Sequence, residues 1–268
     1  MVEEELLVEV EVSFLLTTPP QVSGFIVHIG DNGLSYGADV VSTDGEAVLL
    51  EITMAKFWPG RYFVYRAGRG GPPSLEALPN PPLDRFHPTH EVGIISHAEG
   101  YVVAAMVPNH YIGGVLNPNY ELFRYSSHTR TWSTKVIPFD RTSATDLGHV
   151  CGHTTNKVIT VGGDSIGWVD LWRGILVCNM LDEDPVVRFL SLPGRMPTNA
   201  RPLGTWSASA RSYRDVICVG NTLRFVELEY YDDADDEDID YGWKATVMER
   251  ALGVDSALLE YMLYCRQC

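Results

Sequence analysis

The fold prediction rests first on residues 167–181, which have the sequence GWVDLWRGILVCNML. Two apolar runs, residues 168–171 and 175–181, flank the break Trp172-Arg173-Gly174. Apolar runs of this length that are separated by a short break containing glycine are typical of neighbouring antiparallel strands. The stretch therefore predicts the two central strands of a tightly packed antiparallel unit.

Two further strands are predicted on either side of this centre. Lys157–Val161 is apolar and precedes the turn residues Gly162-Gly163-Asp164. Residues 186–192 form the other run, and they follow Pro185, which cannot donate a hydrogen bond to a sheet. Four short antiparallel strands joined by turns form the blade of a propeller, but they also occur in open sheets and sandwiches.

The region has the sequence HTTNKVITVGG at residues 153–163 and GWVDLWRGILVCNMLDEDPVVRFLSLP at residues 167–193. It resembles a plant family, expanded in grasses, that is known as the domain of unknown function number sixteen-eighteen. The resemblance continues at residues 73–82, 92–108, 121–139, 212–229 and 243–247. That family has no agreed enzymatic activity and resembles the propeller-like domains that accompany F-box segments. The resemblance therefore implies a binding scaffold.

The first third of the chain predicts another four-strand unit, followed by a linker. Its strands are expected at Glu9–Leu16, Gly24–Ile29, Ala47–Thr53 and Tyr62–Arg66. Its turns are expected at residues 30–33, Asp44-Gly45 and Pro59-Gly60. The segment from Gly68 to Pro82 is rich in glycine and proline, a composition that disfavours both helix and central strand. We expect it to be a surface linker.

Two more strand sets follow the same pattern on either side of the central unit. One set is expected at Val92–Ser96, Tyr101–Val107, Tyr120–Tyr125 and Trp132–Phe139. The other is expected at Asp215–Val219, Leu223–Tyr231 and Trp243–Met248. The sequence thus predicts an all-β fold of antiparallel four-strand meanders, an incomplete β-propeller-like domain.

The tail, residues 249–268, departs from the family pattern. Asp255-Ser256 can cap a short helix that carries Leu258, Leu259, Met262 and Leu263 on one face, so a C-terminal helix is predicted. We expect a single domain over residues 1–268, with a family-like region at about 6–248, and a shortened family member.

Composition narrows the class of protein. At 268 residues with 45% hydrophobic content, the chain can bury a core, and no apolar stretch reaches the roughly 20 residues of a membrane-spanning helix. The N-terminus lacks the basic and apolar blocks of a signal peptide. The five cysteines show no C-x-x-C spacing, and Cys178 and Cys218 lie inside apolar runs. We expect an intracellular protein of the cytoplasm or nucleus.

The charge argues against two classes of partner. The formal net charge is -15, which repels the phosphates of nucleic acids and of anionic membranes. We therefore expect neither nucleic acid nor membrane as a partner. The acidic run Asp232–Asp240 lacks the D-x-D-x-D-G order of a calcium loop, so we expect a solvated loop there.

The sharpest candidate for a chemical site is the trio His149, Cys151 and His153. In an extended segment these alternating residues would share one face, where they could gather around zinc. A structural zinc site needs four ligands, however, and the sequence offers no fourth Cys or His nearby. We therefore assign no metal, cofactor or catalytic residue, and metal binding by the trio stays open.

The central stretch holds two further candidates. Asp170 and Arg173 could form an acid with an anion-binding partner, but a charged pair beside a tight turn more often satisfies backbone groups or forms a local ion pair. Trp168 and Trp172 would share a face if no turn or bulge separated them, and core packing is favoured for at least one.

No catalytic motif stands out. Gly113-Gly114 and Gly162-Gly163 are not followed by a helix N-terminus or by Gly-Lys-Ser/Thr, and no G-x-S-x-G elbow is present. The sequence favours a non-enzymatic protein-interaction scaffold that binds an unidentified protein partner through loops at one end of its strands. The alternative is a small hydrolase or lyase with a cleft that the sequence does not disclose.

Overall fold

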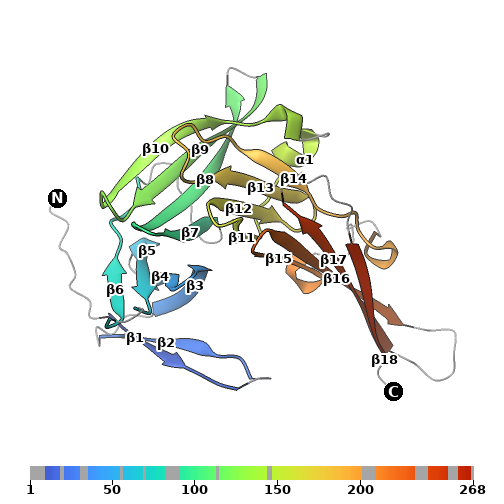
Figure 1. Ribbon diagram of the computed structural model, residues 1–268, viewed down its shortest axis with the longest axis horizontal. Coiled ribbons are helices and arrows are strands. Elements are labelled where there is room, and N and C mark those ends of the chain that lie inside the picture. The colour runs from blue at the N-terminus through green and yellow to red at the C-terminus, as the bar shows by residue number, and fades with distance from the viewer. Residues whose placement is uncertain are drawn as a thin grey trace. The chain divides into compact units, whose positions relative to one another are not determined.

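Figure 1 shows the computed structural model of the chain. The structure describes residues 10–18, 21–30, 36–54, 57–68, 71–82, 91–112, 115–143, 147–200, 209–232, 241–252 and 259–266. The chain divides into two compact units, Met1–Thr89 and His90–Cys268. The expectation of a single domain stays a prediction.

The first unit contains a two-stranded sheet and a four-stranded sheet. The two-stranded sheet pairs β1 (Val10–Leu15) with β2 (Gly24–Ile29). The four-stranded sheet runs, in order, through β3 (Tyr36–Asp44), β4 (Ala47–Met54), β5 (Phe57–Arg66) and β6 (Ser74–Ala77). The strands predicted at residues 47–53 and 62–66 therefore belong to one sheet, and those predicted at 9–16 and 24–29 to another.

Three predictions for this unit were wrong. β3 was missed because its sequence, YGADVVSTD, mixes glycine, alanine and aspartate into the apolar pattern. β6 lies inside the predicted linker, where pairing with β5 outweighs the unfavourable composition. Pro59-Gly60 lies within β5 instead of forming a turn, next to a register irregularity between Ile52 and Met54. The turn predicted at 30–33 falls largely outside the described residues.

Aromatic contacts join the two sheets of the first unit. The Phe14 ring lies 4.5 Å from the Phe25 ring and 4.8 Å from the Tyr65 ring, centroid to centroid. Leu50, Ile52 and Phe63 are buried in the same cluster. The β1–β2 hairpin thus covers one face of β4 and β5 with apolar side chains.

The second unit consists of three antiparallel sheets that follow one another along the chain (Figure 1). The first sheet contains β7 (Val92–His97), β8 (Gly100–Ile112), β9 (Val115–Ser126) and β10 (Thr131–Pro138). The second contains β11 (Lys157–Val161), β12 (Ser165–Asp170), β13 (Gly174–Asn179) and β14 (Arg188–Ser191). The third contains β15 (Arg214–Val219), β16 (Thr222–Asp232), β17 (Tyr241–Ala251) and β18 (Leu259–Arg266).

Each of these sheets is a meander in which consecutive strands pair, as the sequence predicts. The turn at Gly162 and Gly163 needs residues that tolerate left-handed backbone, and their φ angles are +63° and +89°. Separate four-strand meanders without a closed barrel among the described residues confirm the predicted class, an incomplete propeller-like all-β fold.

Sheet-on-sheet packing forms the core of the second unit. One cluster joins the β7–β10 sheet to the β11–β14 sheet around the fully buried Trp168 and Ile166. Another joins the β11–β14 sheet to the β15–β18 sheet through Val169, Ile175 and Phe225. Alternate residues of β12 therefore serve two different interfaces, which explains why this strand is apolar at nearly every position.

Helical structure is short in the described part of the chain. The α-helix α1 (Leu147–Cys151) buries Val150 in the core, and the 3-10 helices are η1 (Arg141–Ser143), η2 (Pro197–Ala200) and η3 (Ala210–Ser212). None of these helices is long and apolar enough to cross a membrane.

The predicted C-terminal helix was wrong. Leu259–Arg266 forms strand β18, which pairs with β17 from Leu259 opposite Glu249 to Arg266 opposite Gly242. The sequence LEYMLYCR supports either period, because its apolar residues alternate and also recur at helical spacing. Pairing with the edge of β17 stabilises the strand over the helix.

Candidate functional site

The predicted metal ligands do not lie in an extended segment. His149 and Cys151 belong to α1, and His153 follows it. Residues two apart on a helix point in widely different directions, so the trio does not share the face that alternation predicted. Val150 anchors the helix in the core, which turns the exposed His149 towards solvent. No group of three His, Cys, Asp or Glu side chains that could hold a metal occurs among the described residues.

His153 has a structural contact. Its Nε2 atom lies 3.1 Å from the carbonyl oxygen of Trp168. Because a carbonyl only accepts hydrogen bonds, Nε2 carries the proton and donates it. Burial lowers the pKa of His153, although the neighbouring Asp170 carboxylate opposes the shift. The neutral imidazole thereby ties the segment after α1 to strand β12.

Asp170 organises the turn between β12 and β13. Its buried carboxylate accepts from the backbone N–H of Trp172 at Oδ1 and of Thr154 at Oδ2, each at 2.9 Å. Arg173 donates from Nη1 to Oδ2, also at 2.9 Å. The carboxylate therefore satisfies two backbone donors and one ion pair, which confirms the structural role predicted for Asp170 and Arg173.

The two tryptophans of the central stretch differ in environment. Trp168 is fully buried, and its indole Nε1 donates to the backbone oxygen of Glu91 at 2.7 Å. Trp172 lies in the turn after β12 and is half-buried. Because a turn separates the two tryptophans, they do not share one face of a strand. This confirms core packing for one of them and leaves the second near the surface.

A buried ion pair, missed from the sequence, joins the start of β15 to β16. Arg214 and Glu227 lie opposite each other in register, and both side chains are 0% exposed. Their Nη2 and Oε2 atoms are 3.1 Å apart. Glu227 shares the inward face of β16 with Phe225, so a carboxylate at an inward strand position was the available signal.

The pair also fixes the chain between β14 and η2. Arg214 donates to the backbone oxygens of Pro193 at 2.7 Å and Gly194 at 3.1 Å. Glu227 accepts from the backbone N–H of Met196 at 3.0 Å. Burial lowers the pKa of Arg214, and the Glu227 carboxylate acts against that shift. The pair thus clamps residues 193–196 from both sides.

A second carboxylate on the same face holds η2. Glu229 accepts from the Thr198 hydroxyl at 2.7 Å and lies 3.2 Å from Lys244 Nζ. Burial raises the pKa of Glu229, but the bonds from Thr198 and Lys244 outweigh it and lower the pKa overall. Both carboxylates of this face are therefore bound to structural partners.

Arg195 stacks on Trp172 at the end of the β11–β14 sheet where the β12–β13 turn lies. Its Cζ atom is 4.4 Å from the centroid of the Trp172 ring, within cation–π range. The Cζ atom of the buried Arg214 lies 5.4 Å from the same centroid. Two guanidinium groups therefore meet at one indole.

The outer face of the C-terminal sheet is apolar and exposed. We use this name for the face of β15, β16 and β17 that is opposite to Phe225 and Glu227. Its four most exposed large apolar residues are between 39% and 57% accessible: Ile217, Val219, Tyr230 and Trp243. A groove of about 250 Å³ runs over it and is lined by Ile217, Arg224, Val226 and Val247, among others.

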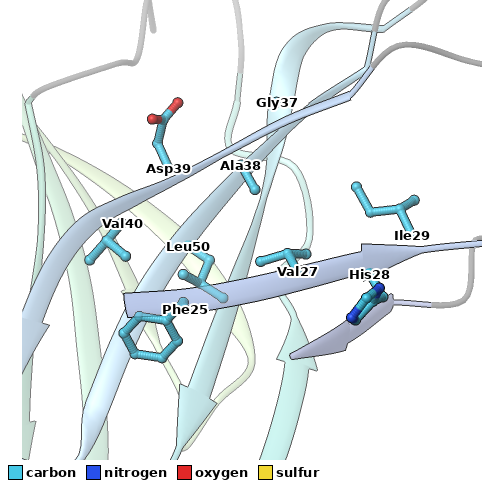
Figure 2. A pocket seen from close by; sticks show the side chains of 9 residues that line it. All are labelled: Phe25, Val27, His28, Ile29, Gly37, Ala38, Asp39, Val40 and Leu50. Atoms are coloured by element: carbon cyan, nitrogen blue, oxygen red, sulfur yellow. The ribbon is translucent and has the colours of Figure 1, made fainter. Parts of the chain in front are cut away.

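The first unit has a crevice of about 510 Å³ between β2 and β3 (Figure 2). Val27, Val40 and Leu50 lie between the two strands. His28 and Asp39 line its rim, but Figure 2 shows their side chains on the outer sides of the strands, pointing away from each other. The residues that line the crevice therefore include no convergent pair of ionisable side chains.

One family model matches the chain, that of the Protein of unknown function (DUF1618), over residues 168–258. We call the matched residues, 168–258, the DUF1618 segment. The DUF1618 segment starts at Trp168 and includes the turn of Asp170, the Arg214–Glu227 pair and the outer face of β15–β17. Neither a curated protein nor a solved structure was found to match the chain.

Proposed function

We propose that this chain is a non-enzymatic protein-interaction scaffold of a plant cell, and that the outer face of its C-terminal sheet binds a β-sheet of a protein partner. The carrying observation is the exposure of Ile217, Val219, Tyr230 and Trp243 on one face of one sheet. Grouped apolar side chains of this size mark binding surfaces more often than single exposed residues do.

The kind of partner follows from the opposite face of the same sheet. There, Val216, Leu223, Phe225 and Met248 pack on the β11–β14 sheet. The outer face also carries aliphatic and aromatic side chains. A partner sheet laid across it would pack as the inner sheets pack on one another.

The charges on the outer face favour an apolar partner surface. Arg224 and Glu249 neutralise each other at 2.8 Å, and Asp215 is bound by Lys157 at 2.7 Å. Surface pairs of this kind add little affinity, so the apolar residues supply most of the binding free energy.

Three buried carboxylates of the DUF1618 segment support binding over catalysis. Asp170, Glu227 and Glu229 each hold backbone or side-chain donors of neighbouring loops. A catalytic carboxylate needs an oxygen that faces substrate, whereas these oxygens face the protein. An Asp170→Ala change would therefore act on the fold of the turn.

The test uses a matched pair of variants. Ile217→Asp places a charge on the outer face, and Val136→Asp makes the same change at a residue of β10 that is 53% exposed. Tagged wild-type and variant proteins are used to capture partners, each of which is identified by mass spectrometry and produced in pure form. We expect the pure partner to bind wild type and Val136→Asp but to bind Ile217→Asp at least tenfold more weakly.

Equal binding of all three proteins would overturn the proposal. Size-exclusion chromatography with light scattering tests whether the outer face binds a second copy of this chain instead of a different protein. If Ile217→Asp changes only the oligomeric state of the protein, the outer face binds a second copy, and the proposal of a separate partner is wrong.

We also propose that the scaffold works in a reducing compartment, the cytoplasm or the nucleus. Cys151, Cys178 and Cys218 are free thiols, and burial raises the pKa of Cys178 to about 12, which suits an inert thiol. Alkylation of the unfolded protein without reductant, followed by mass measurement, should modify all five cysteines. Partial modification in protein isolated from its own cells would contradict this placement.

A further inference from the structure

We propose that the stack of Arg195 on Trp172 is a binding site for a carboxylate of an acidic peptide segment. The site lies in the loops at one end of the β11–β14 strands and is separate from the outer face of the C-terminal sheet. The inference therefore does not depend on the function proposed above.

The backbone of Arg195 is held in place from both sides. Its predecessor Gly194 accepts from Arg214 Nη2 at 3.1 Å, and its successor Met196 donates to Glu227 Oε1 at 3.0 Å. Both partners belong to a fully buried ion pair. Arg195 thus extends from a rigid position, which lowers the entropy cost of binding a ligand.

The other half of the site is equally fixed. The backbone N–H of Trp172 donates to the buried Asp170 carboxylate at 2.9 Å. The indole then supports the Arg195 guanidinium from one face at 4.4 Å. A guanidinium that binds a ring through its cation–π contact can still direct N–H groups to a planar acceptor.

Arg195 has no carboxylate partner among the described residues. The other arginines near the turn are engaged: Arg173 with Asp170, Arg211 with the backbone oxygen of Asn156, and Arg214 with Glu227. Instead, the guanidinium groups of Arg195 and Arg214 both lie near the Trp172 ring, at 4.4 Å and 5.4 Å from its centroid. An anion bound to Arg195 would offset this like-charge contact.

The chemistry favours a carboxylate over a phosphate. A carboxylate matches the edge of a guanidinium with two parallel hydrogen bonds and carries a single charge. The chain has a formal net charge of -15, so a doubly charged phosphate meets more repulsion on approach. The half-buried indole also offers apolar contact to the chain that carries the carboxylate.

Three blocked peptides test the site by isothermal titration calorimetry: one with a single glutamate, one with glutamine in its place, and one with phosphoserine. The proteins are wild type, Arg195→Gln, Arg195→Lys and two controls. Arg188→Gln removes the same charge from an exposed residue of β14, and Ile217→Asp alters the outer face.

We expect the glutamate peptide to bind wild type with a Kd on the order of 1 mM or tighter, and the glutamine peptide to bind at least tenfold more weakly. Arg195→Gln should weaken glutamate binding about tenfold, and Arg195→Lys should weaken it several-fold, because lysine lacks the planar fork. Arg188→Gln and Ile217→Asp should change it less than twofold. Thermal melts confirm that each variant is folded.

Equal binding of the glutamate and glutamine peptides would overturn the proposal, as would equal binding by wild type and Arg195→Gln. Preferential binding of the phosphoserine peptide would also overturn it, because the site would then be a phosphate site. Ile217→Asp is expected to leave peptide binding intact. Failure of the carboxylate site and failure of the outer face to bind a partner can therefore be told apart.

Discussion

The buried ion pair of Arg214 and Glu227 needs additional hydrogen bonds to be stable inside an apolar sheet. Taking two charges out of water costs several kcal/mol, and the attraction between them offsets this only with further hydrogen bonds. Those bonds come from the backbone of residues 193–196. The pair is thus tied to the position of the loop between β14 and η2, and the loop in turn carries Arg195.

We predict that Glu227→Gln destabilises the protein by about 3 kcal/mol or more, because it leaves the charge of the buried Arg214 without a counter-ion. Urea unfolding measures the change. The control is Glu249→Gln, which breaks the more exposed pair with Arg224 and should cost under about 1 kcal/mol. Equal losses for the two variants would contradict a special role for burial.

Glu51 should make stability fall as the pH rises. Burial, with a smaller contribution from Asp39, raises the pKa of Glu51 from its ordinary 4.5 to about 7. The folded protein therefore holds this proton more tightly than the unfolded chain. The resulting stability is complete below about pH 4.5 and is lost as the pH rises through about 7.

The matching variant is Glu51→Gln, which cannot ionise. Its free energy of unfolding relative to wild type should rise by up to about 3 kcal/mol between pH 4.5 and pH 8. Glu99→Gln, in an exposed turn, is the matched control variant. A pH-independent difference for Glu51→Gln would show that the carboxyl is not buried as described.

At the residue scale, the sequence predicted the structural role of Asp170 and Arg173 correctly because Trp172 and Arg173, two of the donors to Asp170, lie in the same short turn. It could not predict the Arg214–Glu227 pair or the stacking of Arg195 on Trp172, because these contacts join residues 13 and 23 positions apart. It was wrong about the direction of His149 and Cys151 because the burial of Val150, a tertiary effect, selects a helix there.

At the scale of elements, strand β13 depends on a glycine at its first position. A Cβ atom on Gly174 would lie 2.6 Å from the backbone oxygen of Leu190 and would also meet the ring of Phe189. The neighbouring strand β14 cannot yield without losing its pairing with β13. Phe189 belongs to the core, so the ring has little room to move.

We predict that Gly174→Ala destabilises the protein by about 2 kcal/mol or more, as overpacking of a core does. Thermal unfolding followed by circular dichroism measures it. Gly37→Ala in β3 is the control, since nothing lies within 4 Å of its added Cβ atom. A Gly174→Ala protein as stable as the control would contradict the close approach of β14 to β13.

Strands were predicted correctly where the local sequence has a clear pattern of apolar runs and turns. The sets around β7–β10 and β11–β14 were predicted because apolar runs and glycine turns agree there. β3 and β6 were missed, and β18 was predicted as a helix, because pairing with a neighbouring strand stabilises sequences whose own preference is weak or mixed.

At the scale of the whole molecule, stacking of sheets explains both the core and the exposed surface. In the second unit, the β11–β14 sheet is covered on both faces, whereas the β15–β18 sheet has one covered face and one outer face with accessible apolar residues. Exposure of an apolar face to water is unfavourable in the free protein, and burying that face against a partner stabilises the complex. The fold therefore supplies the surface on which the proposed function rests.

Photoactivated carbene labelling of exposed side chains, with and without the purified partner, tests that function most directly. The account predicts that the partner reduces labelling of Ile217, Val219, Tyr230 and Trp243 and leaves labelling of Val136 unchanged. Unchanged labelling of the four outer-face residues in a saturated complex would contradict it.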